Sequence, residues 1–337
     1  MRSLTSLVGA ALLVAVSAGP VALAPVASAD DGAPQAFTIT DDRITESSGL
    51  AASRAHPGVY WTHNDSGDGP YLYAVDGRTG RTLATVTLTG VGAPRDVEAI
   101  SVGPGNTLYV GDIGDNSGGS WSHVWIYQLP EPEKLHDQKV RATQYTVTYE
   151  DGPRNAEALM VHPRTGRVYI VDKNENGGHL YVGPKQLSAT GSNVFRKVAP
   201  IDLWVTDGAF SPDGRHLAVR GYFGGILYDW RDGRPKRAAT LTVPMQGQGE
   251  SVTYTADGSA LMYGSEGENS RVEPGPLPDT GSGSASSGGA GQSGGKGDGS
   301  GADGSAADYG KGALVLLLAL AVVYGGRQWV GRRRPGR

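Results

Sequence analysis

Hydrophobic and polar positions alternate in short runs between residues 36 and 276, and the runs recur in units of about 40 to 60 residues. Each unit opens with a small or acidic residue, then Ala, Gly or Ser, then an apolar residue. A Gly/Pro turn and a second alternating run follow. This period-2 pattern predicts half-buried strands joined as hairpins, and no stretch outside two apolar segments near the chain ends has the 3.6-residue period of a helix.

Five hairpins are predicted in this way. Third and fourth strands follow in the first four units, whereas the fifth unit ends after a weak third strand near residues 270–273. Residues 36–40 have the alternation of an outer strand, so we expect the start of the chain to complete the last unit and hide its edge. Repeats of this length that close on themselves predict an all-β, five-bladed β-propeller, with six blades as the alternative. The hairpins pair Ser48–Leu50 with Val59–Trp61, Glu98–Ile100 with Leu108–Val110, Glu157–Leu159 with Val168–Val171, Gly208–Phe210 with Leu217–Val219, and Glu250–Val252 with Leu261–Tyr263.

The first 29 residues have the pattern of a signal peptide. They contain Arg2, a short apolar run and the sequence Ala27-Ser28-Ala29, which is the small-residue pattern of a signal-peptidase site. We therefore expect an exported protein whose mature chain starts at Asp30 and whose propeller ectodomain covers residues 30–276.

The C-terminal residues predict a tethered protein. Residues 277–311 form a Gly/Ser-rich segment that is too polar to fold and is expected to be a flexible linker. Residues 312–324 are apolar, and with residues 325–330 added and Arg327 snorkelling outward, residues 312–330 match the roughly 20 residues of a transmembrane helix. Residues 331–337 are basic, which places the tail in the cytoplasm and the ectodomain outside. Leu277–Gly281 reads LPxTG and resembles a sortase signal, so attachment to the cell wall is the alternative.

Composition excludes several kinds of site. The 337 residues contain no Cys, which rules out disulfides, thiolate metal sites and a cysteine nucleophile. Residues 30–276 carry 30 acidic and 22 basic residues, a net charge of −8. Nucleic acid is not expected to bind such a surface, whereas cations are favoured.

The expected inner strands of the propeller begin around one axis, so their first residues meet at one channel mouth. Three carboxylates there need a cation or shared protons, since like charges raise one another's pKa. Calcium suits an irregular set of oxygen ligands, and Asp207 could assist. Alternatively, the acids accept hydrogen bonds from neighbouring strands and bind nothing. The aligned residues are Ser48, Glu98, Glu157, Gly208 and Glu250, of which Ser48, Glu98, Glu157 and Glu250 are the predicted metal ligands.

The ends of the second strands add a polar rim. His63 could act as a general base if Asp65 or Asp112 oriented it. Lys173 and Arg220 could bind an anion, or could neutralise neighbouring acids. Asn, Asp and Gly are also ordinary turn residues. The catalytic candidates are His63, Asp112, Lys173 and Arg220, and the ligand-binding candidates are Asn64, Asp65, Asp115, Asn116, Tyr222 and Glu266.

Several of these stretches resemble exported, membrane-tethered propellers of the WD-repeat-like kind from high-GC Gram-positive bacteria. A fainter similarity is to the calcium-activated nucleotidases, in which a Ser/Glu ring holds an axial calcium. Ser48, Glu98, Glu157 and Glu250 match that ring, whereas Gly208 departs from it. The first resemblance implies the fold over residues 36–276, and the second implies the calcium. The stretches that carry the first likeness are Glu46–Leu50, Tyr60–Gly67, Asp96–Ile100, Gly111–Asn116 and Thr206–Phe210.

Taken together, these patterns favour a binding protein: a monomeric ectodomain, tethered outside the membrane, that holds calcium and a small ligand or a cell-surface partner at its channel mouth. The alternative is a calcium-dependent hydrolase of phosphate esters or anhydrides, in which Lys173 or Arg220 stabilises charge. A third possibility is a purely structural surface protein. Binding is preferred because the sequence shows no nucleophile–base pair and no G-x-S-x-G, H-E-x-x-H or Walker motif.

Overall fold

Twenty-one β-strands and no helix make up residues 33–278, which are the residues described by the computed structural model. The predicted all-β class is confirmed for this part of the chain. Within it, no helix has the length and apolar character needed to cross a bilayer. The predicted signal peptide, transmembrane helix and basic tail, and all but the first two residues of the linker, lie outside the described residues.

The strands fall into five units of sequential, antiparallel neighbours. Units II and III are joined into one eight-stranded sheet, and unit I gains β9 as a fifth strand. Unit I contains β2 (Ser47–Ala52), β3 (Val59–Asn64), β4 (Tyr71–Asp76) and β5 (Thr82–Thr89); unit II contains β6 (Val97–Gly103), β7 (Thr107–Asp112), β8 (Val124–Pro130) and β10 (Thr143–Tyr149). Unit III contains β11 (Ala156–Val161), β12 (Val168–Asp172), β13 (Gly178–Val182) and β14 (Ser192–Ile201); unit IV contains β15 (Val205–Phe210), β16 (His216–Gly221), β17 (Gly225–Arg231) and β18 (Arg234–Leu241). Unit V contains β19 (Gly249–Tyr254), β20 (Leu261–Ser265), β21 (Arg271–Gly275) and β1 (Phe37–Thr38).

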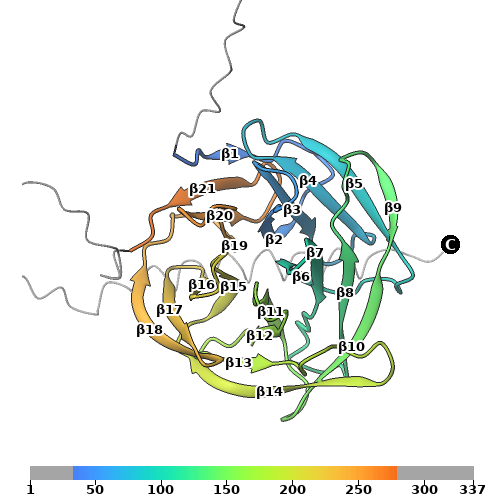
Figure 1. The fold of residues 1–337 in the computed structure, drawn as a ribbon, viewed down its shortest axis with the longest axis vertical. Helices are drawn as coiled ribbons and strands as arrows, with labels where there is room; N and C mark the ends of the chain where they lie inside the picture. The colour runs from blue at the N-terminus through green and yellow to red at the C-terminus, as the bar shows by residue number, and fades with distance from the viewer. Residues whose placement is uncertain (1–32, 279–337) are drawn as a thin grey trace, which may run out of the picture. The chain divides into compact units, whose positions relative to one another are not determined.

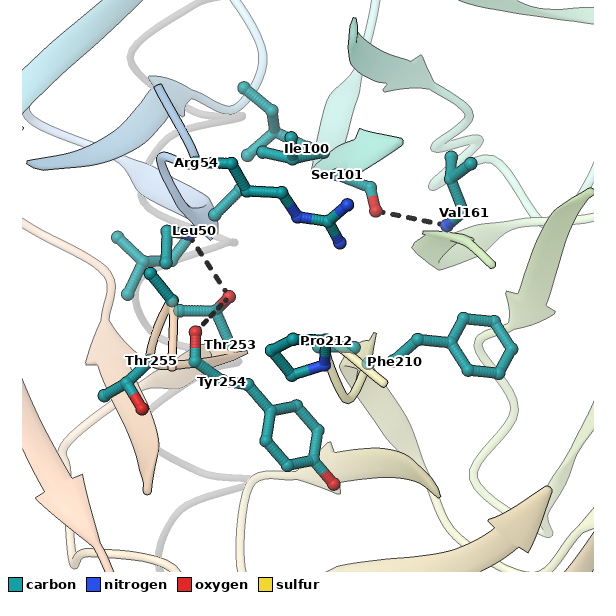
Figure 2. Close-up of a pocket in the computed structure, with 16 residues that line it drawn as sticks. Leu50, Arg54, Ile100, Ser101, Val161, Phe210, Pro212, Thr253, Tyr254 and Thr255 are labelled. Atoms are coloured by element: carbon teal, nitrogen blue, oxygen red, sulfur yellow. Dashed lines mark hydrogen bonds between the residues drawn. The ribbon is translucent and has the colours of Figure 1, made fainter. Parts of the chain in front are cut away.

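The units stand around a common axis, with β2, β6, β11, β15 and β19 innermost (Figure 1). Each inner strand contacts the next, and β19 contacts β2, so the inner strands form a closed ring. The ring surrounds a narrow axial channel, one end of which is shown in Figure 2. This arrangement is β-propeller-like.

The start of the chain closes the last unit, as predicted. Phe37 pairs with Val272 and Thr38 with Arg271 in an antiparallel ladder between β1 and β21. Ile39 N–H then donates to the Ser270 carbonyl at 2.9 Å. The added strand covers the outer edge of unit V, which would otherwise expose unpaired backbone groups.

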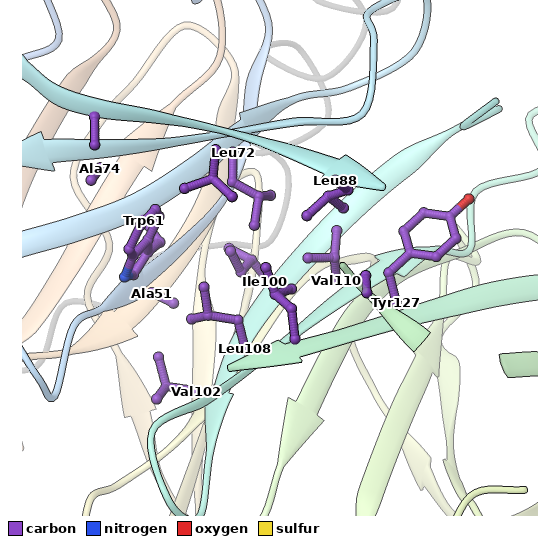
Figure 3. Close-up of a cluster of buried hydrophobic side chains, with 14 of the residues drawn as sticks. Ala51, Trp61, Leu72, Ala74, Leu88, Ile100, Val102, Leu108, Val110 and Tyr127 are labelled. Carbon is purple, nitrogen blue, oxygen red and sulfur yellow. The ribbon is translucent and has the colours of Figure 1, made fainter. Parts of the chain in front are cut away.

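Hydrophobic clusters fill the spaces between neighbouring units. Figure 3 shows the cluster between units I and II, where Trp61 and Leu72 face Leu108 and Tyr127. Corresponding clusters lie between units II and III, III and IV, IV and V, and V and I. Both faces of every inner strand are therefore buried, which explains their nearly continuous burial compared with the alternating pattern of outer strands such as β5.

Two parallel pairings connect the outer strands of neighbouring units. Residues 138–141 form the short strand β9 (Gln138–Arg141), which was not predicted and which pairs with β5 of unit I. Immediately after β9, β10 pairs with β14 of unit III. The outer strands of the first three units are thus linked by backbone hydrogen bonds as well as by side-chain packing.

Candidate metal and ligand site

A β-bulge at the start of each inner strand positions the candidate side chains. In unit II, Val97 pairs with Asp112 but Ala99 pairs with Gly111, so Glu98 is the extra, unpaired residue. The same register shift occurs at Glu157 in unit III and at Glu250 in unit V. In unit I it falls between Ser47 and Leu50, next to Ser48. A bulge redirects a side chain out of the strand's ordinary alternation, so these four residues are equivalent, as the repeat alignment predicted.

The alignment was wrong in unit IV. Val205 pairs with Gly221 and Asp207 with Arg220, so the bulged residue is Thr206, two positions before Gly208. Thr206 is buried, and its hydroxyl donates to the Gly249 carbonyl at 3.2 Å. Gly208 instead packs close to Met160, whose sulfur would lie 2.6 Å from an added Cβ. Every bulge position therefore carries a side-chain oxygen.

Lys173 introduces a positive charge among the bulge carboxylates. Its Nζ lies 2.8 Å from Glu157 Oε1 and 5.6 Å from the centre of the Tyr222 ring. Burial opposes its charge, but Glu157, Tyr222, Glu250 and Glu98 together keep the pKa of Lys173 well above its usual value. The chain thus supplies a cation of its own beside Glu157.

Even so, the carboxylates outnumber the positive charges. Burial raises the pKa of Glu157 to about 7, although Lys173 acts in the opposite direction. Burial, with Glu157 and Asp65 as the nearest like charges, raises the pKa of Glu98 well above its usual value. The pKa of Glu250 is also raised by burial. These groups either share protons or take up a further cation.

The densest group of carboxylates lies at Asp65, Asp96 and Glu98, where one oxygen from each residue lies within 4.8 Å of the others. Burial and the neighbouring Asp96 raise the pKa of Asp65 to about 9. Asp65 Oδ1 is buried and has no hydrogen-bond partner. A buried oxygen without a partner in a carboxylate cluster fits a site for a hard cation.

Gly114 lies directly against this cluster. A Cβ at this position would collide with Asp96 Oδ2 and would lie 2.6 Å from Glu98 Oε1. Ser48 lies on another side, where its hydroxyl is 3.1 Å from the Glu98 carbonyl oxygen and 3.2 Å from Glu98 Oε2. The space between the carboxylates exists because residue 114 has no side chain.

Asp96 was not predicted as a ligand. It lies just before β6 begins at Val97, and because Glu98 is bulged, the alternation of side chains along the strand gave no sign that the two carboxylates meet. Asn116, a predicted ligand-binding residue, donates to Asp96 Oδ2 at 3.2 Å and so does lie at the cluster. Tyr222, beside Lys173, also lies among the carboxylates.

Of the four catalytic candidates, Lys173 is the one that forms an ion pair with a bulge carboxylate in the described residues. His63 is buried behind Gly49, with Nδ1 bonded to the Asn64 carbonyl, and burial lowers its pKa to about 4. Neither Asp65 nor Asp112 is among its hydrogen-bond partners in the described residues, so a base oriented by them is not formed.

The side chains of Asp112 and Arg220 form hydrogen bonds with backbone groups of the protein. Asp112 accepts hydrogen bonds from the N–H groups of Arg95 and Asp96 and from Tyr127. Arg220 is 0% exposed, and its Nη1 donates to the carbonyls of Ser251 and Gly264 at 3.1 and 3.2 Å. Of the two cations expected to bind an anion or to neutralise neighbouring acids, Lys173 pairs with Glu157, whereas Arg220 makes no ion pair in residues 33–278.

Three predicted ligand-binding residues have structural partners. Asn64 accepts hydrogen bonds from the N–H groups of Thr45 and Glu46. Asp115 accepts one from the Trp121 N–H at 2.6 Å, which closes its own loop. Glu266 accepts one from Gln248. Asp207, the predicted auxiliary ligand, bonds the N–H groups of Gly208 and Val252 and so joins units IV and V.

No protein-family model matches the chain, and no curated protein is similar to it. Solved structures with a related arrangement include a hydrazine synthase from Kuenenia stuttgartiensis, at 16% identity and a TM-score of 0.39. That match covers 67% of this chain and 58% of the other, so the chain spans less than two thirds of that relative. The PQQ-bound aldose sugar dehydrogenase from Streptomyces coelicolor shares 14% identity over 70% of this chain and 95% of the other, with a TM-score of 0.42. U3-55K shares 9% identity over 72% and 98%, with a TM-score of 0.38. These scores are too low to carry any conclusion about activity.

Proposed function

We propose that the protein is an exported, five-bladed β-propeller, tethered to the membrane by its C-terminal segment, that binds a calcium ion and a ligand or partner at its channel mouth. Units I to V are the proposed blades. The five hydrophobic clusters support this count because each fills the space between two neighbouring units. Export and tethering rest on the sequence patterns of residues 1–29 and 312–337.

The observation that carries the proposal is the group formed by Asp65, Asp96 and Glu98. Oxygen ligands of this kind suit calcium, which tolerates irregular geometry. Two of the three side chains are more than nine-tenths buried, and burying three carboxylates together without a cation is costly. The unpartnered Asp65 Oδ1 and the space left by Gly114 are the features that fit a bound ion.

The proposed ion is displaced from the ring predicted from sequence. Lys173 already pairs with Glu157 and acts electrostatically on Glu250, so this side of the mouth has a cation of its own. Glu98, with Ser48 beside it, is the ring member left to bind the ion together with Asp65 and Asp96. An anionic group of the ligand would bind between the calcium and Lys173.

The alternative of a calcium-dependent hydrolase has less support. Hydrolysis needs a group that can activate water within reach of the metal. His63, the sequence candidate for a base, faces Gly49 with its Nε2 buried and unpartnered. Arg220 is committed to backbone carbonyls. Binding is therefore the function that the geometry favours.

Calorimetric titration of calcium into the full-length chain tests the proposal. Asp65→Asn and Glu98→Gln each remove one charged ligand, and each is expected to weaken calcium binding at least about tenfold, since loss of a charged interaction is worth roughly 1.5–3 kcal/mol. Glu133→Gln is the matched control because Glu133 is exposed and lies outside the cluster. Absence of calcium binding in the wild-type chain, or equal affinity in all three variants, would refute the calcium site.

A further inference from the structure

The axial channel has a second mouth at the other end of the inner strands, next to their hairpin turns. The carboxylates lie where these strands begin, whereas this cavity is lined by residues near the strand ends (Figure 2). Apolar side chains, including Leu50, Ile100, Val161 and Phe210, form part of its wall, but most of the surface that faces the cavity is polar. The free volume is about 40 Å³, enough for roughly three water molecules at about 10–15 Å³ each. Only a small chemical group fits.

Arg54 is the only charged residue lining this cavity in the described part of the chain. Figure 2 shows its guanidinium extending across the opening from the turn that follows β2. Its one hydrogen bond is a long contact of 3.5 Å from Nη1 to the Gly103 carbonyl. No carboxylate in residues 33–278 lies within ion-pair distance of it.

The nearest acid acting on Arg54 is Glu131, and its carboxylate is already occupied. Glu131 accepts hydrogen bonds from Ser53 Oγ, from the Trp61 indole at 2.7 Å and from the Ala55 N–H at 3.2 Å. Burial lowers the pKa of Arg54, and the charge of Glu131 offsets this only in part. A partly buried guanidinium without a partner gains most from an anion.

Ser101 lines the same cavity and can add a donor. Its Oγ accepts the Val161 N–H at 3.1 Å, and its own hydroxyl proton has no acceptor in the described residues. The hydroxyl of Thr255, also in the lining, already donates to Asp257. One guanidinium and one hydroxyl match the two oxygens of a planar carboxylate.

We propose that this mouth binds a single carboxylate group on a short aliphatic stem, with the carboxylate held by Arg54 and Ser101 and the stem against the apolar side chains of the lining. The group can come from a free short-chain monocarboxylate or from an acidic side chain of a partner polypeptide. The site is independent of the proposed calcium site, which lies at the opposite end of the inner strands.

Nuclear magnetic resonance titrations of propionate and of N-acetyl-glutamate amide into the full-length chain test the proposal, with calcium chelated. Arg54→Gln should weaken binding of either probe at least tenfold. Ala256→Phe should do the same by filling the mouth, since Ala256 lines the cavity and is solvent-exposed. Arg231→Gln is the charge-matched control because Arg231 is an exposed arginine on β17.

The outcomes separate clearly. Binding of propionate alone supports a free acid as the ligand, whereas binding of both probes supports an acidic side chain as well. The proposal is overturned if propionate does not bind, if Arg54→Gln or Ala256→Phe binds as tightly as Arg231→Gln, or if inorganic phosphate binds more tightly than propionate. Unchanged melting temperatures in the variants will show that they remain folded.

Discussion

Replacing Lys173 with Met removes the only ammonium group that contacts the bulge carboxylates, while keeping a side chain of similar length. In the native chain, Lys173 Nζ lies 2.8 Å from Glu157 Oε1 in a largely buried position. The variant leaves the Glu157 carboxylate without its counter-charge. The negative charge of Glu157 then repels those of Glu98 and Glu250. We expect the folded state to be destabilised because a buried charge has lost its counter-charge.

The size of the effect follows from the geometry. At 2.8 Å and an effective dielectric constant of about 20, the attraction is about 6 kcal/mol before solvation is counted. Breaking buried pairs typically costs about 3–5 kcal/mol. For a domain of this size, such a loss lowers the melting temperature by about 10 °C.

The loss of stability in Lys173→Met should depend on pH. The pKa of Glu157 is about 7 in the folded chain, against an ordinary value of 4.5. Because the folded pKa is raised, the folded state loses stability as pH rises from about 4.5 to about 7, and the full loss is present above pH 7. Lys173→Met should therefore lower the melting temperature strongly at pH 8 and only slightly at pH 5.

Thermal unfolding followed by circular dichroism at both pH values measures this difference. Lys197→Met is a matched control: Lys197 Nζ is also 2.8 Å from a carboxylate, that of Asp151, but its side chain is 41% exposed compared with 19% for Lys173. The control should lose about 1 kcal/mol or less. Equal losses in the two variants, or a loss for Lys173→Met that is the same at pH 5 and pH 8, would refute this reasoning.

Three other predictions follow from the same contacts. Gly114→Ala should weaken calcium binding at least tenfold in a calorimetric titration, because the new methyl group collides with the carboxylates of Asp96 and Glu98; unchanged affinity would exclude a site there. Without calcium, the melting temperature should fall from pH 5 to pH 9, because the pKa of Asp65 is raised to about 9 and its ionisation therefore destabilises the folded state. Added calcium should make the melting temperature less dependent on pH. A melting temperature that does not change with pH in chelator would contradict this prediction. Glu131→Gln should cost about 2 kcal/mol in urea unfolding, because charged hydrogen bonds to the unit I hairpin are weakened; an unchanged midpoint would show that they contribute little.

The strands could be predicted from the sequence because each one depends on a local pattern. Alternation predicted a third strand in each of the first four units, where β4, β8, β13 and β17 lie, and the turn sequences located the hairpins. The short strand β9 was missed because Gln138–Arg141 is largely polar and pairs through its backbone with a strand some fifty residues earlier. The alternation of side chains gives no sign of such a pairing.

The site was predicted only in part, because the position of a β-bulge depends on the register between two paired strands. Glu98, Glu157 and Glu250 recur before similar residues, so an alignment finds them. In unit IV, the sequence Asp207-Gly208-Ala209 resembles the same pattern, but the register with β16 makes Thr206 the bulged residue. Likewise, only the three-dimensional structure shows that His63 points at Gly49 rather than into the channel.

Because of the parallel pairings β5–β9 and β10–β14, units I to III should separate from one another less readily than units IV and V. Units I to III cannot separate until these backbone ladders break. Among the described strands, units IV and V have no such ladder to another unit. The segment that adds β1 to unit V is joined to unit I at one residue, where Thr40 bonds the Gly80 carbonyl. Transient opening should therefore begin at units IV and V, so the amide protons of β15–β21 should exchange with deuterium before those of β5–β14.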